Sequence, residues 1–162
     1  MKKTIFFAAF LLAMFFVQAQ KIRKLGIVDI ENYIAASKDQ VLVINFWATF
    51  CKPCVAEIPF FIKITNKYKS DSVKLLLVSL DLPSFYPKKI AAFVKQRKFN
   101  APVFWLNETN ADYFCPKVDP KWSGSIPATL IINTKSGYRK FFEEEMEEPM
   151  FEKELQTAIS GS

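Results

Sequence analysis

The stretch that decides the fold is Val41-Leu-Val-Ile-Asn-Phe-Trp-Ala-Thr-Phe-Cys-Lys-Pro-Cys-Val-Ala-Glu-Ile-Pro59. Its first six residues form a nearly unbroken apolar run that is rich in β-branched side chains, which predicts a strand buried on both faces. From Cys54 onward, apolar residues recur every three or four positions, which predicts a helix. The sequence therefore predicts a strand that delivers a Cys-x-x-Cys pair, Cys51 and Cys54, to the N-terminus of a helix.

A cysteine at a helix N-terminus is well placed to be a thiolate, because the unpaired N–H groups and the positive end of the helix dipole stabilise negative charge there. Thiols in such places have pKa values of roughly 3.5–7.5, against about 8.5 for a free cysteine. We therefore expect Cys51 to be the nucleophile. Cys54, one turn further into the helix, is placed to attack a mixed disulfide formed on Cys51. Pro53 suits the first turn, where its missing N–H leaves no hydrogen bond unmade.

The segment Trp47-Ala-Thr-Phe-Cys-Lys-Pro-Cys54 resembles the active-site signature of the thioredoxin superfamily, Trp-x-x-x-Cys-x-Pro-Cys. The whole strand-to-helix stretch is most similar to the extracytoplasmic TlpA/ResA-type thiol-disulfide oxidoreductases. Pro59 stands where that family kinks its active-site helix, and Glu57 matches an active-site glutamate of the ResA-like branch. Asn45 replaces the buried aspartate of ordinary thioredoxins, as it does in that branch. The similarity extends from about Val41 to the end of the chain.

Ser125-Ile-Pro-Ala-Thr-Leu-Ile-Ile-Asn133 resembles the family's cis-proline loop and the strand that follows it. The resemblance implies that the bond before Pro127 is cis and that Ile126 offers backbone hydrogen bonds to a bound substrate strand. It also implies a redox disulfide between Cys51 and Cys54. Trp47 is expected beneath the active site, where its indole is explained equally well as a substrate-binding group or as core.

Glu57 is the acid–base candidate of the motif, because the chain contains no histidine and Asn45 replaces an aspartate. A carboxylate one turn after Cys54 can accept the proton of the resolving thiol, or raise thiol pKa values by repulsion between like charges. The alternative interpretation is a solvated helix carboxylate. Lys52 adds positive charge near the nucleophile, which favours the thiolate and shifts the site towards an oxidant, whereas Glu57 acts in the opposite direction.

Hydrophobic periodicity in the rest of the chain predicts an α/β fold independently of the motif. The expected elements are a short strand and a helix capped near Asp29 within residues 26–37, strands over 72–81, 101–106, 128–133 and 137–142, and helices over 88–99 and 147–160. This order predicts a thioredoxin-like fold with a central mixed β-sheet and helices on both faces.

The N-terminus predicts a secretory signal peptide over residues 1–19, followed by one thioredoxin-like domain over residues 20–162. Met1-Lys-Lys-Thr is a short basic segment, residues 5–17 are apolar and uncharged, and Val17-Gln-Ala19 ends the run with small residues where a signal peptidase cleaves. We expect a periplasmic or otherwise extracytoplasmic protein. The alternative is an uncleaved N-terminal membrane anchor, although the apolar run is shorter than the about 20 residues that span a bilayer.

Composition excludes several other kinds of site. Val55 follows the pair where covalent haem attachment needs histidine, and the absence of histidine rules out mixed Cys/His zinc sites. No metal or other cofactor is expected, and no basic run indicates nucleic acid. The third cysteine, Cys115, lies among apolar neighbours and is expected to be an inert thiol, with an intermolecular or regulatory bridge as the alternative. Trp122 is expected to pack an inserted loop or to line the substrate groove.

The sequence therefore predicts an exported thiol-disulfide oxidoreductase that acts on protein thiols and disulfides, with an upstream redox donor such as a membrane reductase. Pro53 stands where strong oxidants of the superfamily tend to carry histidine, which favours a reductant. Two alternatives remain. A peroxiredoxin-type peroxide reductase needs Thr or Ser three residues before its cysteine, whereas Thr49 stands two before Cys51. A thioredoxin-like Cu(I)-binding module would use both thiols, but such chaperones add a distant histidine.

Overall fold

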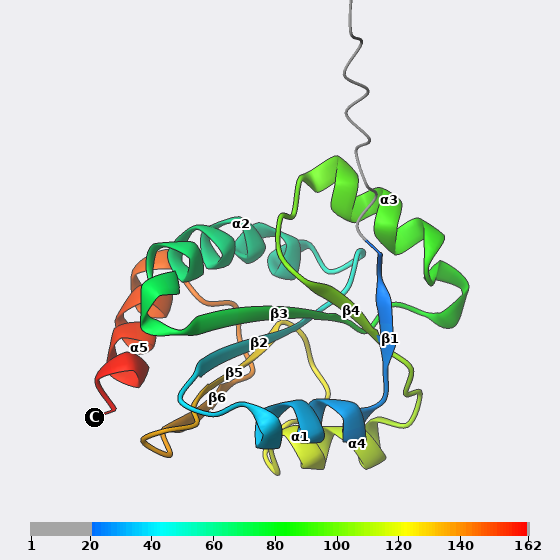
Figure 1. Ribbon diagram of the computed structural model, residues 1–162. Coiled ribbons are helices and arrows are strands. Elements are labelled where there is room, and N and C mark those ends of the chain that lie inside the picture. The colour runs from blue at the N-terminus through cyan, green and yellow to red at the C-terminus, as the bar shows by residue number, and fades with distance from the viewer. Residues whose placement is uncertain (1–20, 162) are drawn as a thin grey trace, which may run out of the picture.

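A single mixed sheet organises the computed structural model, which describes residues 21–161 of the 162-residue chain. The strand order is β1-β4-β3-β2-β5-β6 (Figure 1). The predicted signal peptide lies outside the described residues, and within them no helix is long and apolar enough to cross a membrane. The strands are β1 (Arg23–Leu25), β2 (Val41–Trp47), β3 (Val73–Ser79), β4 (Val103–Leu106), β5 (Ala128–Asn133) and β6 (Arg139–Phe142).

Strand β2 lies at the centre of the sheet, and all seven of its residues are buried. It pairs in parallel with β3, from Val41 opposite Val73 to Trp47 opposite Ser79, and antiparallel with β5. A strand with neighbours on both edges and helices on both faces has no solvated side, which explains why its sequence is an apolar run instead of an alternating one.

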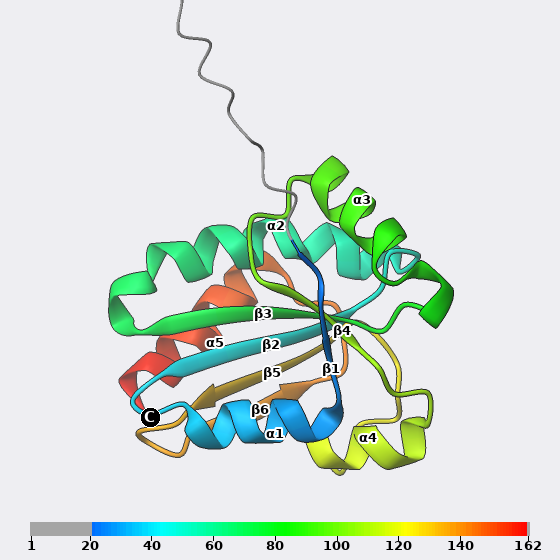
Figure 2. The ribbon, with the colours of Figure 1, turned by 45° about the vertical axis from the view of Figure 1, so that its right-hand side comes forward.

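Helices cover the two faces of the sheet unequally (Figures 1 and 2). Helices α1 (Ile27–Ala36) and α4 (Ala111–Val118) lie on one face, and α2 (Lys52–Lys67), α3 (Lys88–Arg97) and α5 (Glu148–Ser160) lie on the other. Short 3₁₀ turns occur at Lys69–Asp71 and Pro83–Phe85. On the second face Phe61 of α2 stacks on Phe151 of α5, with ring centroids 4.0 Å apart, so the C-terminal helix holds the active-site helix against the sheet.

One local prediction was wrong, and one helix was not predicted. The short strand lies before Gly26, and the helix that follows is capped by Gly26; Asp29 stands inside the first turn, where its carboxylate accepts the Gly26 N–H at 2.7 Å. Helix α4, which has Pro116 within it, was not predicted. It forms because Phe114, Cys115 and Val118 are buried against the sheet.

The other predicted elements are present, with ends that agree within two residues. Trp122 belongs to the core beneath the loop after α4. Its ring packs against Phe46 at 4.7 Å, Phe114 at 5.6 Å and Phe141 at 5.7 Å, and only 5% of the residue is exposed. Packing, and not a place in the lining of a groove, accounts for this tryptophan.

Candidate active site

Cys51 and Cys54 lie at the junction between β2 and α2, and they form a disulfide with a Cα–Cα distance of 5.3 Å. Cys51 is the N-cap of α2, and the Cys54 N–H points at its sulfur at 3.3 Å. Cys51 is 8% exposed and Cys54 is fully buried. The helix N-terminus therefore directs a backbone donor at Cys51 Sγ, and that sulfur is the one of the pair that solvent reaches.

The cis-proline loop forms the opposite wall of the site. The peptide bond between Ile126 and Pro127 is cis. Strand β5 begins at the next residue, and its pairing with β2 places Ala128 opposite Phe46. This register carries the loop to the disulfide, so the carbonyl oxygen of Ile126 lies 3.8 Å from Cys51 Sγ. Antiparallel pairing of two strands that are far apart in sequence thus assembles the two halves of the site.

A glutamate that the sequence analysis missed holds the start of this loop. The Glu143 carboxylate accepts the Ser123 N–H at 3.0 and 3.1 Å, the Ser125 N–H at 3.0 Å, and the Ser123 hydroxyl. Although partial burial opposes the charged form, these hydrogen bonds lower the pKa of Glu143 below its usual value. No local signal identifies Glu143, because it lies within an acidic run that reads as a solvated helix cap.

Glu57 is fully buried, so it is not a solvated helix residue. Its Oε1 accepts the side-chain amide of Asn45 at 2.8 Å, and its Oε2 accepts the N–H of Met146 at 3.1 Å. Asn45 also donates to Thr129 Oγ1 at 3.0 Å. Burial raises the pKa of Glu57 to about 7; the two hydrogen bonds act against that rise, and the charge of Glu145 adds to it. A carboxyl with this pKa can both accept and release a proton at neutral pH.

A second carboxylate ties the turn before Cys51 to the end of β3. Asp81 accepts the Thr49 N–H at 3.1 and 3.2 Å and the Thr49 hydroxyl at 2.6 Å, and it accepts the Ser79 hydroxyl at 2.7 Å. The hydroxyl of Thr49 is therefore engaged with Asp81. This contact holds the two loops beside the disulfide together.

Trp47 lies below the site and presents no surface to solvent. Its ring packs against Phe93 and Phe99, with centroids 6.1 and 5.8 Å away. The exposed apolar groups near the pair are instead Phe50, 65% exposed, and Leu82, 62% exposed. Sequence reasoning missed both, although the position of Phe50 directly before Cys51 was a usable signal.

Cys115 does not join the redox pair, because it lies in the core on the face covered by α1 and α4. Burial raises the pKa of this thiol to about 11, with smaller contributions from the charges of Glu143 and Asp112. Such a thiol is protonated at neutral pH and nearly unreactive. Among residues 21–161 there is also no group of three or more His, Cys, Asp or Glu side chains that could hold a metal ion.

Comparison with known proteins finds one family model and relatives that are named thiol-disulfide oxidoreductases. The model of the AhpC/TSA family matches residues 15–137. Sporulation thiol-disulfide oxidoreductase A of Bacillus subtilis is 32% identical over 73 residues, which are 45% of this chain and 44% of that protein. Thiol-disulfide oxidoreductase ResA of Bacillus cereus is 35% identical over 66 residues, 41% of this chain and 36% of that protein. The matched stretch spans less than half the length of each of these relatives.

Solved structures share most of the fold. A thioredoxin-related protein from Neisseria meningitidis serogroup B superposes with a TM-score of 0.61 at 28% identity, covering 78% of this chain and 87% of that one. StoA from Bacillus subtilis superposes with a TM-score of 0.54 at 26% identity, covering 74% and 84%. The predicted thioredoxin-like α/β fold, a mixed sheet with helices on both faces, is therefore confirmed.

Proposed function

The chain belongs to the AhpC/TSA family, and we propose that, like the relatives named thiol-disulfide oxidoreductases, it exchanges disulfides with protein substrates. The observation that carries the proposal is the Cys51–Cys54 disulfide at the N-terminus of α2, beside the carbonyl of Ile126. It unites a sulfur that is slightly accessible to solvent, a fully buried partner sulfur and a backbone acceptor at one place.

The proposed reaction starts from the dithiol form. The Cys51 thiolate attacks one sulfur of a substrate disulfide, a Cys51–substrate disulfide forms, and the other substrate sulfur leaves as a thiolate that takes up a proton. Cys54 then loses its proton and attacks Cys51 Sγ. The Cys51–Cys54 bond forms, the bond to the substrate breaks, and the second substrate thiolate leaves. Two electrons pass from the pair to the substrate, and an upstream dithiol donor restores the reduced form.

Glu57 is proposed as the group that takes the proton from Cys54. It stands three residues after Cys54 on α2, so both side chains lie on one face of that helix, and both are fully buried. Water has little access there, and a carboxyl with a pKa of about 7 is matched to proton exchange at neutral pH. Its hydrogen bonds to Asn45 and Met146 hold it in place.

The substrate is proposed to bind as an extended segment across Cys51. The loop at Ile126 and Pro127 would pair with its backbone, and the exposed side chains of Phe50 and Leu82 would offer apolar surface to it. Trp47 would contribute from below, by packing, because no part of it is exposed.

The direction of electron flow is proposed to be reduction of the substrate, on the ground of Pro53 between the cysteines. The place of action is proposed to be outside the cytoplasm after cleavage of residues 1–19, with an N-terminal membrane anchor as the alternative. Both rest on the sequence.

The decisive experiment compares wild type with Cys54→Ala in an insulin-reduction assay driven by a dithiol reductant. Wild type should reduce insulin, and Cys54→Ala should stop at a mixed disulfide that mass spectrometry assigns to Cys51. Cys115→Ala is the matched control and should behave as wild type. Parallel assays with hydrogen peroxide and with Cu(I) address the two alternatives. Turnover of peroxide without insulin reduction, or tight Cu(I) binding without exchange, would replace the proposal.

A further inference from the structure

The first half of β3 has an open edge. Strand β4 pairs with β3 only from Leu77 to Ser79, so the segment Val73–Leu76 has a neighbour on the β2 side and none on the β4 side within the described part of the chain. The Leu77 N–H donates to the Pro102 carbonyl at 3.0 Å. Because backbone groups alternate along a strand, the N–H and C=O of Val73 and Leu75 face the same open edge.

The sequence explains why the ladder stops there. The next hydrogen bond would run from the backbone of residue 102 to Leu75, and residue 102 is a proline, which has no N–H to donate. The chain before Pro102 turns towards α2 instead of continuing along β3. Pro102 thus ends the pairing and leaves a slot in the plane of the sheet.

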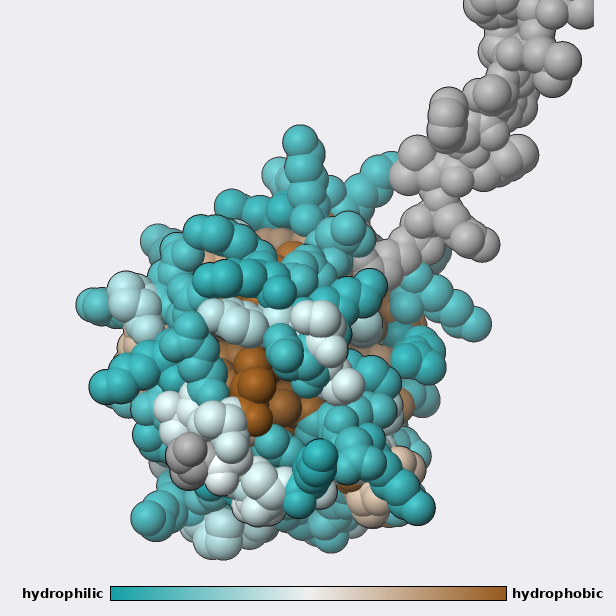
Figure 3. Space-filling view, turned by 60° about the vertical axis from the view of Figure 1, so that its left-hand side comes forward, coloured by the Kyte–Doolittle hydropathy of each residue, from teal (hydrophilic) through white to brown (hydrophobic). Residues whose placement is uncertain are grey.

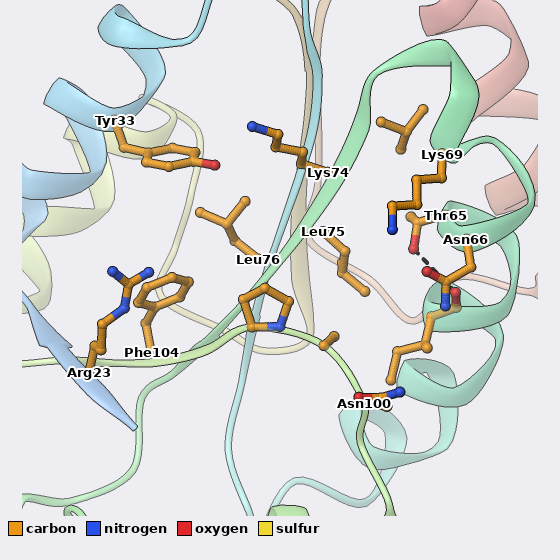
Figure 4. Close-up of a pocket in the computed structure, with 14 residues that line it drawn as sticks. Arg23, Tyr33, Thr65, Asn66, Lys69, Lys74, Leu75, Leu76, Asn100 and Phe104 are labelled. Atoms are coloured by element: carbon orange, nitrogen blue, oxygen red, sulfur yellow. Dashed lines mark hydrogen bonds between the residues drawn. The ribbon is translucent and has the colours of Figure 1, made fainter. Parts of the chain in front are cut away.

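This slot is a groove of about 310 Å³, which we call the β3 groove (Figure 4). Its floor is apolar, with Leu75 and Leu76 of β3 among its lining residues. Figure 3 shows this side of the molecule, where a hydrophobic hollow is ringed by hydrophilic side chains. The groove lies between α1 and α2, so it has two walls, one on each face of the sheet.

The rim of the β3 groove carries positively charged side chains. Arg23 and Lys74 lie on the α1 side with the Tyr33 hydroxyl, and Lys69 lies on the α2 side (Figure 4). No aspartate or glutamate is among the described residues that line it, and none of the three cations forms an ion pair within residues 21–161. Unpaired cations above an apolar floor complement a segment that carries carboxylates.

We propose that the β3 groove binds an extended acidic segment of a partner protein, which adds to the open edge of β3 as a short strand. The N–H and C=O groups of Val73 and Leu75, which face the edge that β4 does not pair, would supply the backbone hydrogen bonds of strand addition. Successive side chains of an added strand point to opposite faces of the sheet. Acidic residues at every second position would therefore meet Arg23 and Lys74, and the apolar residues between them would face the α2 side, where Ile62 and Leu75 line the groove.

The β3 groove does not compete with the disulfide for space. It lies at the start of β3, and the active site lies beyond the other end, where Ser79 contacts Asp81. Seven residues of strand separate the two by about 20 Å. A partner bound there is held beside the molecule while Cys51 stays open, so this inference does not depend on the proposed thiol chemistry.

The test is an NMR titration of ¹⁵N-labelled protein with the peptide acetyl-Glu-Val-Glu-Val-Glu-amide at low ionic strength. Binding should shift the amide signals of Val73 and Leu75 and slow hydrogen exchange at Leu75, while the signals around Cys51 stay unchanged. The same peptide with Gln in place of Glu should bind at least tenfold more weakly. Two further peptides, N-methylated at the valines or at the glutamates, test strand addition. One of them must lose binding, because one set of amides faces β3.

Paired variants distinguish the effect of the cations in the groove from the effect of the protein's overall charge. Arg23→Gln with Lys74→Gln should weaken binding of the acidic peptide about tenfold. Lys95→Gln with Lys88→Gln on α3 removes the same charge elsewhere and should leave the affinity unchanged. Equal binding of the Gln and Glu peptides, or full binding of both N-methylated peptides, would overturn the proposal. A concentration-dependent dimer that protects Leu75 without peptide would also overturn it, by making a second copy of the chain the occupant.

Discussion

Replacing Glu57 by glutamine should change how the stability of the protein depends on pH. In the folded state this carboxyl is fully buried and its pKa is raised from 4.5 to about 7. In the unfolded chain it is solvated and titrates near its ordinary value. Between these two values the folded state holds a proton that the unfolded state has already released, so the unfolding free energy of wild type falls as pH rises through this window.

The size of the effect follows from the two pKa values. A rise from 4.5 to about 7 corresponds to a loss of about 3 kcal/mol of unfolding free energy between the lower and the upper end of the window. A glutamine side chain cannot titrate, so the variant should lack this loss. The substitution also disturbs the hydrogen bonds to Asn45 and Met146, which costs about 1–3 kcal/mol. That cost is independent of pH and shifts the whole curve without changing its slope.

The measurement is urea unfolding of the oxidised protein, followed by tryptophan fluorescence at several values between about pH 4 and about pH 8. In the oxidised form Cys51 and Cys54 do not titrate, and burial keeps the folded-state pKa of Cys115 at about 11. The difference in unfolding free energy between variant and wild type excludes the contributions of the other titratable groups, because both proteins contain them. It should rise by about 3 kcal/mol in favour of the variant across the range.

Glu144→Gln is the matched control, because Glu144 is an exposed glutamate two residues before Met146, whose N–H donates to Glu57. Its curve should run parallel to that of wild type. If the Glu57→Gln curve is also parallel to wild type, then Glu57 titrates alike in the folded and unfolded states. In that case burial does not tune this carboxyl for proton transfer.

Four further predictions concern the site, the core and the N-terminus. In the reduced protein Cys51 should be alkylated at neutral pH much faster than the buried Cys54; equal labelling would remove Cys51 as the nucleophile. Phe61→Ala should lower the unfolding free energy by about 3–5 kcal/mol in urea melts, and a loss below about 1 kcal/mol would contradict its place in the core. Glu143→Gln should raise KM for a disulfide substrate several-fold with kcat nearly unchanged, since it loosens the loop before the cis-proline; an equal fall in kcat with unchanged KM would contradict that role. Mass spectrometry should find a mature protein that begins at about Gln20 outside the cytoplasm, whereas intact chain in the membrane fraction would indicate an anchor.

Local sequence was sufficient wherever the determinant was itself local. The apolar run of β2, the helical spacing after Cys54 and the placing of the cysteine pair between them are short-range patterns, because burial on two faces and helix periodicity leave their signature within a few residues. The motif around Pro127 was equally local. The same reasoning did not predict α4, a helix that forms because Phe114 and Val118 are buried against the sheet.

What the sequence determined by itself is thus the order of strands and helices apart from α4, and the pair Cys51 and Cys54. Only the tertiary structure decided the environment of the site. The pKa of Glu57 depends on Met146, which lies 89 residues away in sequence, and the anchoring of the loop before Pro127 depends on Glu143. The open edge beside Leu75 exists because of how far β4 follows β3. Periodicity shows which face of a segment is apolar, but burial of a charge and pairing of an edge are set by whichever distant segments pack there.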